Sequence, residues 1–112
     1  MSRLIGTAKA RELYFLSEKV DMEEAEQLGL ITGIFPEESL QDEVMTIARR
    51  LAQGPTVAYR YMKENLNRAV HGEMGECLDM EAAHHIHCGT TRDHKEAAQA
   101  FVDKREPNFQ GR

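Results

Sequence analysis

The sequence predicts an all-α fold with about six helices and one short strand. Apolar residues recur three and four positions apart through most of the chain, which is the spacing of an amphipathic helix. Glycine and proline interrupt these patterns where helices would end and begin. Only Leu30–Phe35 has the β-branched and apolar composition typical of a strand. The 112 residues suffice for one domain, which we expect to cover 1–112 as a single helical region.

The first third of the chain contains two predicted helices and the strand. Ala8–Glu18 consists of good helix formers, with apolar residues on one side. Asp21 is placed to cap a second short helix, Met22–Leu28, which a glycine then ends. Leu30–Phe35 follows and stops at Pro36. A strand needs a partner for its backbone N–H and C=O groups, and the sequence contains no other strand candidate.

Four longer helices are predicted after Pro36. The first carries one continuous apolar face, formed by Leu40, Val44, Ile47, Ala48 and Leu51. The glutamates Glu37 and Glu38 at its start agree with the helix macrodipole. The other three are bounded by Gly54–Pro55, His71–Gly72, Gly89 with a cap at Thr90 or Thr91, and Pro107.

Composition excludes several classes of function. A formal net charge of −5 argues against a nucleic-acid partner, which would require a basic face. No apolar run approaches the ~20 residues needed to cross a bilayer, so we expect no membrane partner. Met1–Gly6 lacks the apolar core of a secretory signal, and Cys77 and Cys88 match no disulfide framework. These features favour a cytoplasmic protein with reduced thiols.

Two groups of residues suggest chemistry, and each has a simpler explanation. Cys77, His84 and Cys88 share a helical face, and thiolate with imidazole suits zinc. Zinc sites usually combine ligands from separate elements, however, so an amphipathic helix with two small thiols is favoured. Glu81 lies among apolar neighbours, but a lone carboxylate more often reaches solvent or pairs with arginine. We therefore expect no metal site and no catalytic residue in this chain.

Several segments match motifs of one family, in the right order along nearly the whole chain. Ala100–Phe109 reads AFVDKREPNF, which is similar to an AFxEKRxPxF ending. Arg3–Leu13 is similar to RLIGxxKAxEL, and Glu24–Ile31 to the turn AxxxGLV. Ala48–Pro55 and Lys63–Glu64 match the helices that follow. Each motif is weak alone, but together they resemble the C-terminal helical part of the crotonase superfamily, the enoyl-CoA hydratase/isomerase family.

The resemblance implies acyl-CoA chemistry carried out elsewhere than in these residues. Enzymes of the family polarise a thioester carbonyl with two backbone N–H groups, an oxyanion hole suited to an enolate. Those amides and the catalytic glutamates lie in a spiral β-core that comes before the match to Arg3–Gly6. The resemblance therefore implies a C-terminal part of the crotonase fold lacking its β-core, inactive alone. The parent enzyme would be a hydratase (a lyase) or an isomerase, and no residue here carries over as catalytic.

The resemblance also implies two roles for the helices. In the family they form trimers, often dimers of trimers, and they cover the acyl-CoA site. Phe101 and Lys104 match positions that meet the nucleotide end of coenzyme A, and Arg105 would add positive field there. The alternative for Lys104 and Arg105 is that they only complement a helix C-terminus. No covalently bound cofactor is expected, only the coenzyme A moiety of the substrate.

Two other functions remain open at this stage. One is a stand-alone, non-catalytic helical interaction module derived from the family. The other is a metal-binding helical bundle built around Cys77, His84 and Cys88.

Overall fold

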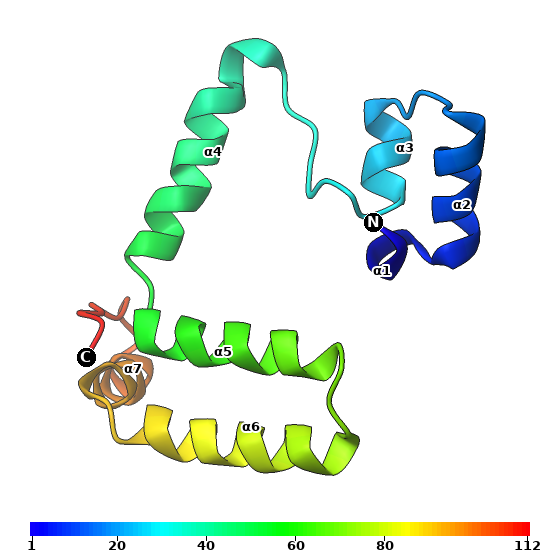
Figure 1. The fold of residues 1–112 in the computed structure, drawn as a ribbon. Coiled ribbons are helices and arrows are strands. Elements are labelled where there is room, and N and C mark those ends of the chain that lie inside the picture. The colour runs from blue at the N-terminus through cyan, green and yellow to red at the C-terminus, as the bar shows by residue number, and fades with distance from the viewer. The chain divides into compact units, whose positions relative to one another are not determined.

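The computed structural model describes residues 1–112 and contains seven α-helices and no β-strand. The predicted all-α class is confirmed. The helix beyond the expected set is α1, Ser2–Ile5, a single turn. The chain divides into two compact units, Met1–Glu43 and Val44–Arg112, and each is described by itself (Figure 1).

In the first unit, two helices follow α1. Helix α2 spans Thr7–Leu16 and ends at Ser17, which adopts the left-handed conformation with φ 53°. Helix α3 spans Met22–Gln27 and begins at the predicted cap, Asp21. A carboxylate oxygen of Asp21 accepts a hydrogen bond from the backbone N–H of Glu24 at 2.8 Å. This bond satisfies one of the donors that the start of a helix leaves free.

A lysine joins α2 to α3. The ammonium of Lys9 lies 2.7 Å from a carboxylate oxygen of Glu12 and 2.9 Å from one of Glu24. Hydrogen bonds to Glu12 and then to Glu24 raise the pKa of Lys9 above its ordinary value. Ala10, the next residue of α2, is buried.

The expected strand Leu30–Phe35 is not formed, and this part of the prediction is wrong. Its first residue closes the end of α3 instead: the N–H of Leu30 donates to the carbonyl of Ala25, and that of Gly29 to Glu26. Gly29 has φ 70°, the left-handed conformation in which glycine ends helices without strain. No other extended segment of the chain pairs with residues 30–36, so no ladder forms.

The second unit is built from four helices. Helix α4 spans Glu37–Ala52, beginning in the first unit, and is followed by α5, Thr56–Ala69. Helices α6, Met74–Gly89, and α7, Arg92–Asp103, complete the set. Figure 1 shows α5 and α6 side by side and antiparallel. Helix α7 lies at the end where α5 begins and α6 stops, and the C-terminal residues return to the start of α5. The four boundaries agree with the predicted ones within a few residues.

Polar contacts fix the turns between these helices. Arg68 near the end of α5 pairs with Glu76 in the first turn of α6. Thr91 is the predicted cap of α7, and its hydroxyl accepts from the backbone N–H of His94 at 3.1 Å. The α5–α6 hairpin and the α7 start are therefore specified by local side chains.

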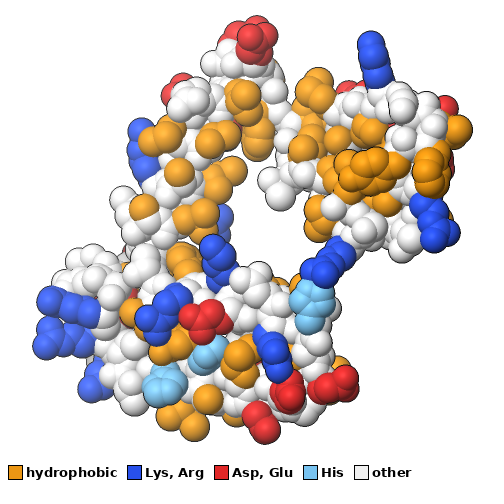
Figure 2. All heavy atoms as spheres, in the orientation of Figure 1, with side chains coloured by type: hydrophobic (Ala, Val, Ile, Leu, Met, Phe, Trp, Pro, Cys, Tyr) orange, Lys and Arg blue, Asp and Glu red, His pale blue; other side chains and the backbone are white.

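Most large apolar side chains remain on the surface. The buried apolar residues are Ala10 and Ala100, both small. Figure 2 shows apolar side chains along α4 and over the α2–α3 pair. None of the helices has the length and apolarity of a membrane span. The exposed large residues include Tyr14, Phe15, Leu16, Leu40, Val44, Ile47, Leu51, Leu66, Leu78, Ile86, Phe101 and Val102.

Candidate functional site

The end of α7 holds both predicted site residues. Helix α7 ends at Asp103, and Lys104 adopts the left-handed conformation with φ 55° and ψ 40°. The N–H of Lys104 donates to the carbonyl of Phe101, and the N–H of Arg105 donates to that of Ala100 at 3.0 Å. These bonds satisfy the free carbonyls of the last turn and redirect the chain.

Phe101 and Lys104 are both open to solvent. The side chain of Phe101 is 85% exposed, and the ammonium of Lys104 forms neither an ion pair nor a hydrogen bond. Because Lys104 lies beyond the last helical residue, the helical repeat does not set its direction. An exposed ring and a free cation are thus close in sequence at one helix end, and their role as a coenzyme A contact stays a prediction.

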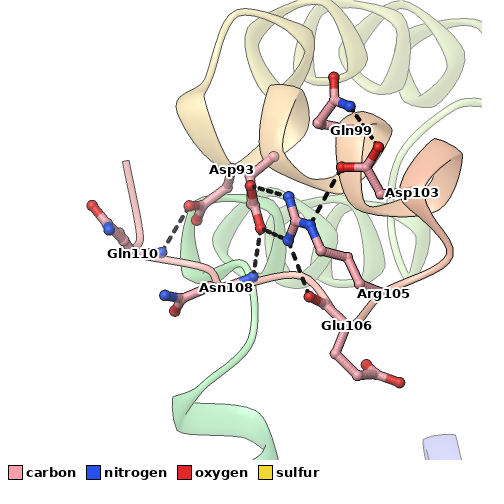
Figure 3. Close-up of polar contacts among 8 residues, drawn as sticks. Asp93, Gln99, Asp103, Arg105, Glu106, Asn108 and Gln110 are labelled. Carbon is pink, nitrogen blue, oxygen red and sulfur yellow. Dashed lines mark hydrogen bonds and ion pairs between the residues drawn. The ribbon is translucent and has the colours of Figure 1, made fainter.

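Arg105 is not a free charge. Its guanidinium forms two bonds to the carboxylate of Glu96, at 2.6 and 3.0 Å, and lies 3.5 Å from Asp103 (Figure 3). The backbone N–H of Asn108 also donates to Glu96 at 2.9 Å. The bond from Arg105 and then the one from Asn108 lower the pKa of Glu96 to about 2. The expectation that Arg105 adds positive field beside Lys104 is therefore wrong, because Glu96 neutralises it.

Asp93 fastens the C-terminal residues to the start of α7. Its side chain is buried, and one carboxylate oxygen accepts the backbone N–H of Gln110 at 2.8 Å (Figure 3). The other carboxylate oxygen accepts the backbone N–H of Gly111, also at 2.8 Å. Its own N–H donates to the carbonyl of Arg112 at 3.0 Å. Sequence reasoning missed this contact, because an acid in the first turn of a helix is already explained by the macrodipole.

His84 has a structural role between two helices. Its Nδ1 lies 2.6 Å from the side-chain oxygen of Asn65, and its Nε2 lies 3.4 Å from a carboxylate oxygen of Glu64. The imidazole also stacks on the ring of Tyr61, with centroids 4.3 Å apart. Both ring nitrogens and one face of His84 therefore hold α6 against α5. Asn65 of α5 therefore orients this histidine.

The residues considered for metal binding do not converge. No group of three or more histidine, cysteine or acidic side chains is arranged to hold a metal ion. Cys77 and Cys88 are free and half-buried. Glu81 is exposed at the edge of a hollow between α5 and α6. The metal-binding bundle has no support in this geometry.

Comparison with known proteins defines the family. The sequence model of enoyl-CoA hydratase/isomerase matches residues 1–112. The chain belongs to the enoyl-CoA hydratase/isomerase family. It is 31% identical over 112 residues to 1,2-epoxyphenylacetyl-CoA isomerase of Escherichia coli K12, covering 100% of this chain and 43% of the relative. The resemblance inferred from the sequence motifs is confirmed.

Solved structures of this enoyl-CoA hydratase/isomerase family have the same fold. An enoyl-CoA hydratase subunit from Geobacillus kaustophilus superposes with a TM-score of 0.92 at 35% identity, over 99% of this chain and 43% of that one. An enoyl-CoA hydratase from Bacillus anthracis has a TM-score of 0.91 at 30% identity, over the same shares of the two chains. The chain thus spans about 43% of the length of these relatives and corresponds to their C-terminal helical part.

Proposed function

We propose that this chain acts as the C-terminal helical part of an acyl-CoA enzyme, where it makes subunit contacts and covers part of the coenzyme A site. The observation that carries the proposal is the family match along all 112 residues, with an all-helical structure. The relatives are named for work on CoA thioesters, as in 1,2-epoxyphenylacetyl-CoA isomerase and crotonyl-CoA hydratase. The chemistry of the whole protein would be hydration of a 2-enoyl-CoA or a related isomerisation.

Exposed apolar helix faces support the subunit-contact part of the proposal. Leu40, Val44 and Ile47 lie on one side of α4, and each is more than 40% exposed. Apolar patches that remain uncovered in a folded chain favour association. Such faces would be covered by a neighbouring subunit or by another part of the same enzyme.

The purified chain should therefore be a dimer or larger at micromolar concentration, as measured by light scattering coupled to size-exclusion chromatography. Ile47→Glu places a charge on the apolar face of α4 and should shift the protein toward monomer. Arg49→Glu, on the polar side of the same helix, is the matched control and should leave the assembly unchanged. A wild-type monomer with a cooperative melt would contradict self-association and favour the stand-alone interaction module.

The tail of α7 supports the coenzyme A part of the proposal. The ammonium of Lys104 is free to meet a phosphate, and the exposed ring of Phe101 is available to an adenine. Lysine suits a terminal phosphate as a compact cation, and base–aromatic stacking is worth ~1–3 kcal/mol per base in nucleic-acid sites. Because two such contacts are weak by themselves, we expect a dissociation constant of ~mM for coenzyme A.

Lys104→Ala should weaken coenzyme A binding about fivefold, since an exposed charge contact is worth at most ~1 kcal/mol. The measurement is an NMR titration of the chain with coenzyme A and with its 3′-dephospho form. The effect of the substitution should shrink for the dephospho form, because the phosphate partner is then absent. Lys95→Ala, an exposed lysine on the same helix, is the control. Equal loss in both lysine variants would mean that the Lys104 assignment is wrong.

A further inference from the structure

Another hollow lies where α4 ends and α5 begins. It is separate from Phe101 and Lys104 at the end of α7. It has a volume of about 580 Å³ and is lined by the last turns of α4, the Gly54 turn, Tyr59 and residues of the C-terminal tail. In Figure 1 this is the junction of α4 and α5 beside the C-terminus. All of its lining residues belong to the second compact unit.

The hollow is lined by two unneutralised arginines. Arg49 and Arg50 both line it, and neither guanidinium takes part in an ion pair or hydrogen bond. By contrast, Arg60, Arg68 and Arg105 each pair with a carboxylate. Guanidinium groups without a protein partner suit the oxygens of a phosphate, which each can bind through paired N–H donors.

The helix dipole does not account for this arrangement by itself. Cations are favourable at the carboxyl end of α4, and that end carries roughly half a negative charge. Two guanidinium groups outweigh this partial charge, so the hollow keeps a positive potential. One acid reduces it: the exposed Glu106 also lines the hollow.

An aromatic wall is held in place beside the arginines. Tyr59 is half-buried, and its ring lies over Gly54 so closely that a Cβ there would stand 2.5 Å from two ring carbons. The absence of a side chain at Gly54 therefore lets the ring occupy this position. Phe109 of the tail contributes a second ring to the lining. Aromatic faces beside a phosphate-binding cation suit a planar base.

The hollow is independent of the apolar face of α4. Thr46, Arg49 and Arg50 lie on the side of α4 opposite Val44, Ile47 and Leu51, given 3.6 residues per turn. A ligand in the hollow therefore does not compete with whatever covers the apolar face. It also does not involve Phe101 or Lys104, which lie outside the lining.

We propose that this hollow binds a nucleoside phosphate, with its phosphate on Arg49 and Arg50 and its base against Tyr59. The site goes beyond the proposed role of the α7 tail, because it uses none of the residues assigned there. Repulsion from Glu106 limits the affinity of the site for an anion.

Calorimetric titration of the 112-residue chain with ADP tests the site. The double substitution Arg49→Gln and Arg50→Gln should weaken ADP binding by about tenfold or more, since two charge-assisted contacts are lost. Arg11→Gln combined with Arg92→Gln changes the net charge by the same amount elsewhere and should leave binding within about twofold. Glu106→Gln should tighten binding, and Lys104→Ala should not change it.

Other ligands and variants separate the two halves of the site. Tyr59→Leu should weaken ADP more than it weakens inorganic phosphate, and adenosine alone should bind less well than ADP. Gly54→Ala should act like Tyr59→Leu, because the added methyl group displaces the ring. Circular dichroism should show unchanged helicity in each variant. The proposal is overturned if wild-type chain does not bind ADP, if both double variants bind alike, or if inorganic phosphate binds as well as ADP.

Discussion

Incubated with a short 2-enoyl-CoA, the purified 112-residue chain should leave the conjugated double bond intact at the rate of the buffer alone. Removing a single oxyanion-hole donor costs ~10²–10³ in rate, and the family resemblance places both donors in a β-core. Three carboxylates considered above are poor replacements. Glu96 is bound by Arg105, Asp93 by the tail amides, and Glu81 is exposed to water.

Absorbance at the enoyl-thioester band, followed across a size-exclusion profile, measures this absence of activity. A mock purification from the same host without the chain shows how much host enzyme carries over through the procedure. Turnover that follows the chain through its own peak would contradict the expected lack of activity. Family membership would stand in that case, because it rests on the sequence match.

The helices could be predicted because their signals are local. The apolar face of α4 and the caps Asp21 and Thr91 each depend on residues within a turn or two. The prediction of a strand at Leu30–Phe35 was wrong because a strand depends on distant residues. Its composition favours extended backbone, but a strand forms only with a distant partner, and Gly29 instead turns the segment off the end of α3.

The candidate sites depend on contacts that sequence spacing does not contain. The C-terminal tail folds back onto α7, so Glu96 meets Arg105 nine positions later and Asp93 meets Gly111 eighteen positions later. Arg105 and Gly111 lie beyond the end of α7, so the helical repeat predicts neither contact, and neither pair has a motif. The hollow at Arg49 and Arg50 also cannot be predicted from the sequence, since the favourable position of cations at a helix C-terminus already accounts for both arginines. Only the return of the tail and the position of Tyr59 reveal it.

The tail contact also gives the largest expected effect on stability. Asp93→Ala removes a buried carboxylate that accepts two backbone N–H groups at 2.8 Å. A hydrogen bond to a charged group contributes about 1.5–3 kcal/mol, so the loss should be roughly 3 kcal/mol even at the lower end. The loss of stability affects residues 108–112 first, because hydrogen bonds from their backbone to Asp93 and Glu96 are what mainly hold them to α7.

Hydrogen exchange measured by NMR resolves this effect at single amides. In Asp93→Ala the amides of Gln110 and Gly111 should exchange on the order of 100-fold faster, because their protection depends on closure of the tail. Asp93→Asn keeps one acceptor oxygen and should give an intermediate rate. Asp79→Ala, an exposed acid on α6, should change stability by no more than ~0.5 kcal/mol. Unchanged protection of both amides in Asp93→Ala would show that the tail is held by its other contacts, through Glu96 and through Gly111 against Thr56.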